Sequence, residues 1–327
     1  MKRCLTLSIA IVAAASLLLG ACSTINVHRA RASRAYLGDL LYVERSGSGA
    51  PVVFLPGLMG STRFWEPVRF SMSNHTLIFV DELGFGRSPW PDVEYTLDDH
   101  LAALRRTLTA EGATSDVTIV AHSFGTILAA HYAARFPDEV DRLYLLGTPL
   151  FRNSEEARAR MRTMSTLAAL FSRSRTLAMG ACILQDALGP IARFVAPLVA
   201  RQTPRPVAED ATLHFWPALD GSVRNVILSR PIEVPLAVVG QKVTFIHGRR
   251  DPITPMERLR AVAVSLGAKI VEVPGDHGDY IGAGTDFVRE ELESAMSQRG
   301  DASVDEHGLS KLNRPPVRFS LLTRARI

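Results

Sequence analysis

A run of β-branched and apolar residues ends abruptly at a serine, and a helix-compatible stretch begins directly after it. The run covers 117–121, the serine is Ser123, and the following stretch is 124–135. A strand, a sharp turn and a helix in succession present one side chain at the apex, and the small residues Ala121 and Gly125 let strand and helix approach each other. The N-terminal amides of the helix point at the same spot, where negative charge is stabilised. The Ser-x-Gly pattern alone is weak evidence, since it recurs at Ser265.

Segments with strand and helix patterns alternate along most of the chain. Expected strands cover 40–43, 52–55, 76–80, 117–121, 143–146, 242–247 and 269–273, and expected helices cover 95–111, 124–135, 255–266 and 285–296. The wholly apolar strand 52–55 is typical of a parallel sheet covered on both faces. The alternation predicts right-handed βαβ units, and therefore the α/β class with a doubly wound, mostly parallel sheet.

The alternation stops at Gly147 and resumes near residue 242. Residues 150–232 contain helical patterns, several prolines and no strand pattern. We therefore predict a helical cap at 150–232, inserted into an α/β core at 36–149 and 233–298. Residues 23–35 are expected to form a linker. Residues 299–327 lack apolar periodicity and are expected to form a flexible tail.

The first 22 residues have the pattern of an export signal. Lys2 and Arg3 precede an uncharged apolar stretch at 5–19, and the segment ends in Leu-Gly-Ala-Cys at Cys22. This ending resembles a bacterial lipobox, whose cysteine is acylated on sulfur and becomes the new N-terminus. The resemblance, with Ser23 rather than aspartate after the cysteine, implies an exported protein anchored by lipid in the bacterial cell envelope, on the periplasmic face of the outer membrane. Ordinary signal cleavage and an uncleaved anchor are the alternatives.

Charge and cysteine content bound the partners and cofactors. The net charge is +4 and comes almost wholly from arginine, and no block of like charge resembles a nucleic-acid tail, so we expect no nucleic-acid partner. Cys4 and Cys22 lie in the signal, so Cys182 has no partner for an intramolecular disulfide in the mature chain. Cys182 lies in an apolar run and is expected to be a packed thiol. No motif suggests a metal, and no cofactor is expected.

Polar residues suited to catalysis follow separate strands of the expected sheet. In an open parallel sheet, catalytic groups gather at the carboxyl ends of the strands. Ser123 follows the strand 117–121, Asp251 follows 242–247, and His277 follows 269–273. A serine hydroxyl needs a base to take its proton, an imidazole titrates in the right range, and a carboxylate holds the imidazole in the correct tautomer. The chain order of serine, acid and histidine matches that of the hydrolase triad.

Motifs in these loops resemble those of the α/β-hydrolase fold superfamily, over roughly residues 36–298. The run 56–59, Pro-Gly-Leu-Met, matches the His-Gly oxyanion loop of that family, with proline in place of histidine. The run 81–88 matches its Asp-x-x-Gly-x-Gly-x-Ser turn. His-Gly-x-x-Asp at 247–251 matches its acid loop, and Gly-x-His at 275–277 matches its histidine loop. The resemblance implies a helical cap on an α/β-hydrolase core.

The resemblance also implies a role for each site residue. Ser123 is expected to attack an acyl carbonyl, His277 to act as base and then acid, and Asp251 to orient His277. The backbone N–H groups of Leu58 and Phe124 are expected to form the oxyanion hole. The serine at the elbow argues against epoxide opening and halide displacement, for which relatives use an aspartate.

Other residues near the site have competing interpretations. His122 adjoins the serine, but neighbouring strand residues point to opposite faces, so we expect it to be packed or to face the substrate. Phe64 and Trp65 follow the oxyanion loop and are expected either to line the substrate pocket or to pack in the core. Asp276 flanks His277 and cannot easily reach behind its ring. His247 is expected to pack the loop, and Asp81 to form the turn.

These observations predict a serine hydrolase that cleaves a carboxylic ester or related acyl bond through an acyl-enzyme. Its expected partners are a small-molecule or lipid-like acyl substrate and, through the lipid anchor, a membrane; the oligomeric state stays open. Alternatives are a carbon–carbon bond hydrolase or an acyltransferase of the same fold, and a non-catalytic envelope binding protein. Residues 150–232 carry eleven arginines against six acidic residues, which suits either an anionic substrate or lipid headgroup, or simply solvated helix faces. The apolar run 177–200 suits either an acyl pocket or a cover over the sheet.

Overall fold

The fold is known from a computed structural model, which describes residues 38–68, 74–164, 174–200, 203–277 and 286–294. The chain divides into two compact units, one up to Thr285 and one from Asp286 onward. In the second unit the described residues 286–294 are helical. The predicted signal, linker and tail, with Cys22, lie outside the described residues.

The first unit is built on one seven-stranded sheet with the order β1-β3-β2-β4-β5-β6-β7. The strands are β1 (Val43–Gly47), β2 (Ala50–Leu55), β3 (His75–Val80), β4 (Val117–His122), β5 (Val140–Leu146), β6 (Val243–Gly248) and β7 (Lys269–Val273). β1 pairs with β3 in antiparallel orientation, and every other pairing is parallel. The predicted fold class, an α/β doubly wound and mostly parallel sheet, is therefore confirmed.

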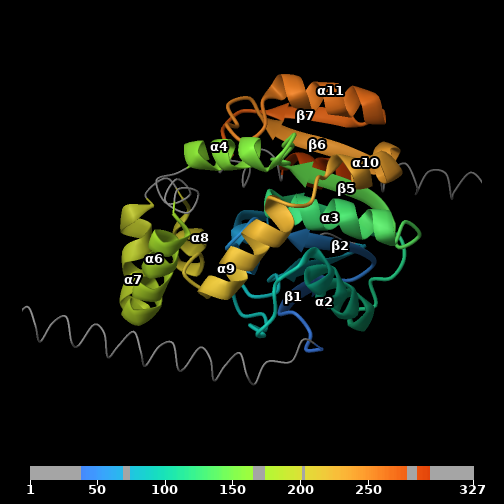
Figure 1. Ribbon diagram of the computed structural model, residues 1–327. Helices are drawn as coiled ribbons and strands as arrows, with labels where there is room; N and C mark the ends of the chain where they lie inside the picture. The colour runs from blue at the N-terminus through green and yellow to red at the C-terminus, as the bar shows by residue number, and fades with distance from the viewer. Residues whose placement is uncertain (1–37, 69–73, 165–173, 201–202, 278–285, 295–327) are drawn as a thin grey trace, which may run out of the picture. The chain divides into compact units, whose positions relative to one another are not determined.

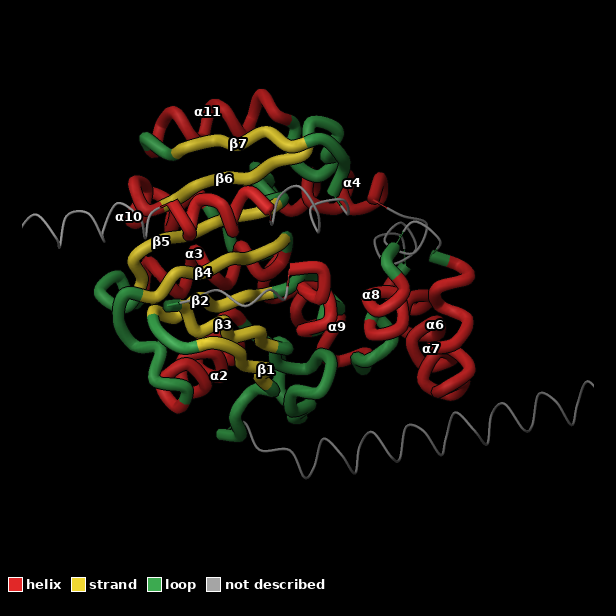
Figure 2. Tube along the Cα trace, turned by 180° about the vertical axis from the view of Figure 1, so that it is seen from behind, coloured by secondary structure: helices red, strands yellow, loops and turns green. Residues whose placement is uncertain are grey.

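Helices lie along the sheet and beyond one end of its strands. They are α2 (Leu97–Ala110), α3 (Phe124–Arg135), α4 (Ser154–Met164), α6 (Arg175–Leu188), α7 (Pro190–Val199), α8 (Arg205–Asp210), α9 (Trp216–Ser222), α10 (Glu233–Val239) and α11 (Met256–Leu266). The remaining helical segments are the 3-10 helices η1 (Thr62–Val68) and η3 (Gly240–Lys242) and a π-helical turn, η2 (Val223–Ile227). In Figures 1 and 2, α2 and α3 cover one face of the sheet, whereas α4, α6, α7 and α8 lie at the end toward which the parallel strands point.

The first strand begins later than the sequence pattern suggests. We expected a strand at 40–43, but β1 starts at Val43 and continues to Gly47. The N–H groups of Leu41 and Tyr42 donate to the side-chain oxygens of Thr107 and Ser88, at 2.9 and 2.8 Å. Those side chains take the donors that a sheet ladder would use, so pairing with β3 begins only at Val43.

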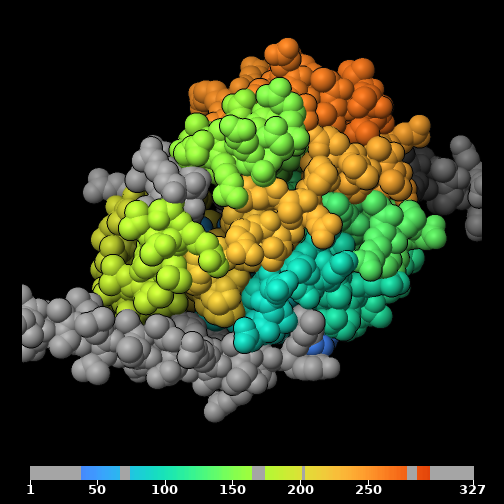
Figure 3. All heavy atoms as spheres, viewed as in Figure 1, coloured from blue at the N-terminus to red at the C-terminus, as the bar shows by residue number. Residues whose placement is uncertain are grey.

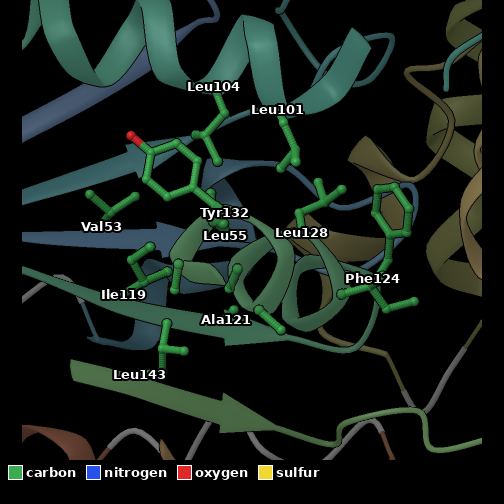
Figure 4. Packing of buried hydrophobic residues seen from close by; sticks show 14 of the residues in the cluster. Val53, Leu55, Leu101, Leu104, Ile119, Ala121, Phe124, Leu128, Tyr132 and Leu143 are labelled. Carbon is green, nitrogen blue, oxygen red and sulfur yellow. The ribbon is translucent and has the colours of Figure 1, made fainter. Parts of the chain in front are cut away.

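The apolar core lies between the sheet and the helices α2 and α3. β4 is buried along its whole length, because α3 covers it and strands flank it on both sides. Figure 4 shows Leu101 and Leu104 of α2 directed toward Leu128 and Tyr132 of α3. A reciprocal capping box fixes the start of α2: the Thr96 hydroxyl accepts from the Asp99 N–H, and the Asp99 carboxylate accepts from the Thr96 N–H. The core thus anchors the strand that directly precedes Ser123.

The described residues between 150 and 232 form helices and no strand, apart from a single bridge between His214 and Phe85. The apolar run at 177–200 divides into α6 and α7 at Gly189, whose φ of 46° ends α6, and Pro190 then begins α7. The boundaries assigned to the cap and core from the sequence stay predictions.

Candidate active site

The three residues expected to form a triad come from loops at the same edge of the sheet. β4, β6 and β7 are parallel members of one sheet, with β5 between β4 and β6, so their carboxyl ends lie along the same edge. Ser123 directly follows β4, Asp251 follows β6, and His277 follows β7. Residues far apart in the chain therefore meet at this edge.

Ser123 has a strained backbone at the turn between β4 and α3. Its φ of 49° and ψ of −114° are unusual for a residue with a Cβ, and such conformations cost about 1–3 kcal/mol. The turn is held on both sides: the Ser123 N–H donates to the carbonyl of Leu146 at 2.9 Å, and the Thr126 hydroxyl donates to the carbonyl of Ser123 at 2.6 Å. The strain is that expected where a strand turns directly into a helix and presents its apex side chain.

A continuous hydrogen-bond chain links the serine, the histidine and the aspartate. His277 Nε2 lies 2.8 Å from Ser123 Oγ, and His277 Nδ1 lies 2.8 Å from Asp251 Oδ2. A carboxylate accepts hydrogen bonds, so Nδ1 carries the ring proton and the Nε2 lone pair faces the serine hydroxyl. The Asp251 side chain is fully buried, and its other oxygen accepts from the Ile253 N–H at 2.7 Å. The imidazole is thereby held in the tautomer that can take a proton from the serine.

The loop after β2 lies against the serine turn. A Cβ added to Gly57 would come within 3.3 Å of the Ser123 Cβ, and one added to Gly125 would come within 2.5 Å of the Pro56 carbonyl oxygen. These two glycines let the loop and the first turn of α3 approach each other. Phe124 is the first residue of α3, where N–H groups lack intrahelical acceptors, and Leu58 directly follows Gly57. The loop that carries Leu58 therefore lies against the turn that carries Ser123 and Phe124, and the oxyanion hole itself stays a prediction.

The sequence from residue 50 to residue 283 matches the family model described as alpha/beta hydrolase fold. This match covers well over half of the chain. The chain belongs to the α/β-hydrolase fold family.

Similarity to particular members is more limited. The Arabidopsis thaliana protein named Probable lysophospholipase BODYGUARD 1 is 28% identical in an alignment of 272 positions that covers 73% of this chain and 57% of that protein. Lipase LipV of Mycobacterium tuberculosis is 36% identical over 108 residues, 32% of this chain and 41% of that protein. The matches therefore span less than two thirds of either relative. A thermophilic esterase from Thermogutta terrifontis has a similar fold, with a TM-score of 0.59, 21% identity, and coverage of 78% of this chain and 93% of that chain.

In this α/β-hydrolase, His122 packs behind the histidine loop. Its Nε2 donates to the backbone carbonyl of His277 at 3.0 Å, and its ring stacks on Phe64 with centroids 4.8 Å apart. Burial, with a smaller contribution from the nearby His277, lowers the pKa of His122 to about 3, so His122 is neutral. Of the two roles expected for His122, the packed one agrees with this arrangement. The sequence carried no signal for its bond to His277.

The two aromatic residues after the oxyanion loop are both buried. Phe64 contacts His122 and is 6% exposed, whereas Trp65 is fully buried and packs edge-on against Phe54 of β2. Trp65 is therefore part of the packing beneath the loop. The Phe64 ring contacts both Trp65 and His122, so it lies closer to the triad than Trp65 does. Their roles in substrate binding stay predictions.

Asp81 organises the turn after β3, as its motif predicts. Its carboxylate accepts from the backbone N–H groups of Thr62 and Arg87, which ties the start of η1 to the turn. A Cβ at Gly86, whose φ is 56°, would lie 2.3 Å from the Asp81 carboxylate, so only glycine fits there. Burial raises the pKa of Asp81, although these two N–H donors oppose the shift.

The next residue, Glu82, was not singled out by the sequence motif. It is 3% exposed, and its Oε1 has no hydrogen-bond partner among the residues that the structure describes. Burial raises its pKa well above the ordinary value for glutamate, and the neighbouring Asp81 adds to the shift. No sequence pattern distinguishes this buried acid from an exposed one.

His247 braces the acid loop, as expected from its position. Its Nε2 donates to the carbonyl of Thr254 at 2.8 Å, and the Thr254 hydroxyl donates to the carbonyl of Thr148 at 2.8 Å.

Cys182 is buried with its sulfur 3.6 Å from His214 Nε2, and burial raises the pKa of its thiol to about 12. Within the described ranges, no cluster of three or more histidine, cysteine or acidic side chains could hold a metal ion.

Proposed function

We propose that this protein is a serine hydrolase that cleaves carboxylic esters, or closely related acyl compounds, through an acyl-enzyme. The observation that carries the proposal is the pair of 2.8 Å contacts joining Ser123, His277 and Asp251. Such an arrangement activates a hydroxyl that is otherwise a poor nucleophile near neutral pH. Two of the relatives bear the names lysophospholipase and lipase, which supports an ester as the substrate class.

Acylation begins when Ser123 Oγ attacks the carbonyl carbon of the ester. The hydroxyl proton passes to His277 Nε2, and the carbonyl π electrons move onto its oxygen, which becomes an oxyanion. The N–H groups of Leu58 and Phe124 stabilise that charge, and Asp251 stabilises the imidazolium. The oxyanion re-forms the carbonyl, the bond to the alcohol breaks, and His277 gives its proton to the departing oxygen.

Deacylation repeats these steps with water as the nucleophile. The oxygen of the water molecule attacks the acyl carbon while His277 takes one of the water protons. His277 then gives that proton to Ser123 Oγ as the serine leaves. The products are a carboxylic acid and the free serine. Because His277 acts as base and then as acid in each half, it must hold one orientation throughout, which is the part assigned to Asp251.

A fluorophosphonate probe and the turnover of p-nitrophenyl butyrate test the proposal. Ser123→Ala should abolish labelling and reduce kcat by about 10⁶-fold. The matched control is Ser265→Ala, which alters the other Ser-x-Gly pattern at an exposed site in α11, where the hydroxyl donates to the Val262 carbonyl. Labelling that survives in Ser123→Ala, or a wild-type protein that neither labels nor turns over any ester, would contradict the proposal. The second result would favour a binding protein.

We further propose that Cys22 is acylated and anchors the exported protein in the cell envelope. The support is the charged start, apolar stretch and Leu-Gly-Ala-Cys ending of the first 22 residues. Radiolabelled palmitate should be incorporated by the wild-type chain and not by Cys22→Ala when both are expressed in bacteria. Equal labelling of the two chains would overturn this part of the proposal.

A further inference from the structure

Two consecutive helices of the insertion, α6 and α7, expose much apolar surface. We call this pair the cap hairpin. Its exposed large apolar residues are Leu177, Met179, Leu184, Ile191, Phe194, Val195, Leu198 and Val199. The remaining large apolar residues exposed in the described ranges are Leu40, Val234, Val238 and Val264. Apolar patches of this kind are rare on soluble proteins unless they bind a partner or a membrane.

The exposure follows from how the hairpin is packed. In α7 no side chain is buried, and in α6 only Ala178 and Cys182 are buried. Ile191 and Phe194 are three positions apart and therefore share one face of α7, where they are 62% and 70% exposed. Figures 1 and 2 both show α8 between this hairpin and the sheet, with α6 and α7 on the outer side. Figure 3 shows the same helices forming one side of the space-filling surface.

The dimensions of the hairpin suit a membrane surface better than a membrane span. In the part of the chain that the structure describes, no single helix is long and apolar enough to cross a bilayer, and the α6–α7 pair is bent by 118°. At about 1.5 Å per residue, helices of 14 and 10 residues are shorter than the roughly 30 Å hydrocarbon core. Short amphipathic helices instead lie in the plane of the interface, with the apolar face among the lipids.

The charge of the chain is concentrated in the same insertion. Residues 150–232 contain eleven arginines and six acidic residues, a net charge of +5. The rest of the chain has 37 − 11 = 26 basic and 33 − 6 = 27 acidic residues, a net charge of −1. Arg175 and Arg193 of the hairpin pair with Asp220 and Asp210, and both arginine side chains remain partly exposed. An anionic lipid surface complements this net charge, whereas a second copy of the insertion would repel it.

The hairpin is also connected to the proposed active site through a short series of contacts. Cys182 of α6 lies 3.6 Å from His214, and His214 forms a β-bridge with Phe85. The Phe85 ring lies 6.5 Å from that of Phe124, the residue after Ser123. These contacts connect the inner side of α6 with the first residue of α3, which directly follows Ser123.

We propose that the cap hairpin docks this protein on the surface of an anionic phospholipid bilayer, with Ile191 and Phe194 inserted between the lipids. Docking then presents acyl substrates that reside in the bilayer to Ser123. Only this second statement rests on the proposed function, since binding itself requires no catalysis.

A fluorescent label on the hairpin tests docking directly. The full chain, with Cys4→Ser and Cys22→Ser to remove the other reactive thiols and the acylation site, carries an environment-sensitive nitrobenzoxadiazole label at Phe194→Cys. The matched control carries the label at Val264→Cys, on α11, where the side chain is 83% exposed. Vesicles of phosphatidylglycerol and phosphatidylcholine should shift the emission of the label at position 194 to the blue and leave that at position 264 unchanged.

Each other outcome contradicts the proposal. A label at position 194 that stays water-exposed with anionic vesicles shows that the hairpin does not dock. An equal response to pure phosphatidylcholine shows that anionic headgroups are not what the hairpin recognises. A blue shift that grows with protein concentration in the absence of vesicles shows that a second copy covers the hairpin instead. All of these results are obtained without enzyme activity, so they remain distinct from failure of the proposed hydrolase function.

Kinetics then test whether docking serves catalysis. The double variant Ile191→Ser and Phe194→Ser should raise the apparent KM for a long-chain ester embedded in anionic vesicles roughly tenfold. It should leave kcat/KM for dissolved p-nitrophenyl acetate unchanged. The control is Val234→Ser with Val238→Ser, two exposed residues on α10 that should alter neither parameter. A loss on both substrates, or on neither, would refute the link between docking and turnover.

Discussion

His277 Nε2 lies 2.8 Å from Ser123 Oγ, although the two residues are 154 positions apart in the chain. The contact depends on the parallel arrangement of β4 and β7, which brings the ends of both strands to one edge of the sheet. Asp251 completes the chain of contacts from the far side of the imidazole. Each part of this arrangement can be removed separately.

Asp251→Asn should lower kcat for a soluble ester by about 10⁴-fold with little change in KM. An asparagine side chain lets the imidazole adopt the wrong tautomer without altering the packing. Steady-state kinetics with p-nitrophenyl butyrate measure both parameters. The control is Asp276→Asn, an exposed acid next to His277 in the chain, which should retain nearly full activity. If the Asp276 variant lost more activity than the Asp251 variant, the orienting acid would have been assigned to the wrong residue.

His122→Ala should lower kcat by about tenfold, through the position of His277 rather than through proton transfer. The substitution removes the donor that holds the His277 carbonyl at 3.0 Å and the ring that stacks on Phe64. Because His122 is neutral at the pH of the assay, the shape of the pH–rate profile should not change. His122→Asn, which can still donate a hydrogen bond, should recover part of the rate. A pH–rate profile that loses a titration in His122→Ala would show that His122 is itself an acid or base.

Gly125→Ala should lower kcat by about 10²–10³-fold, because the new Cβ would lie 2.5 Å from the Pro56 carbonyl oxygen and displace the oxyanion loop. Overpacking should also destabilise the protein by about 1–3 kcal/mol. Ester kinetics and thermal unfolding measure the two effects. In the control, Gly180→Ala on α6, the Cβ meets no atom within 4 Å, and helix propensity should make this variant slightly more stable. Normal activity in Gly125→Ala would mean that the loop tolerates the displacement.

Glu82→Gln should stabilise the protein at neutral and alkaline pH. The folded-state pKa of Glu82 is raised, so the folded protein holds a proton that the unfolded chain releases above about pH 4.5. Its contribution to stability is therefore fully present below that pH and is lost as the pH rises toward the folded-state pKa. Glutamine cannot ionise, so the variant should be more stable than wild type at pH 8 and should differ little from it at pH 4.

Urea unfolding at both pH values measures this difference. Glu94→Gln, at an exposed glutamate, serves as the control and should show no pH-dependent gain. A constant difference between Glu82→Gln and wild type from pH 4 to pH 8 would show that Glu82 does not titrate abnormally.

Several features of the protein could be predicted from the sequence because their signals are local. Alternating strand and helix patterns predicted the sheet class, and the helix at 124–135 begins and ends as expected. The order of Ser123, Asp251 and His277 after their strands was sufficient to propose that they meet, because parallel strands end at one edge. Strand ends were less accurate: β5 begins at Val140, three residues earlier than expected, because Val140 pairs with Val117.

Other features were decided only by the tertiary structure. His122 and Glu82 are polar residues near strand ends. No local sequence pattern indicates that His122 bonds to the His277 backbone. Nor does one indicate that Glu82 is buried with no partner for its Oε1 among the described residues. The apolar run at 177–200 read equally well as a pocket wall or a cover for the sheet, yet α7 exposes its apolar face. Periodicity reports which face of a segment is apolar. What lies against that face depends on segments distant in the chain. For this reason the sequence alone predicted the proposed chemistry, but not that the cap hairpin exposes the surface proposed to dock on a membrane.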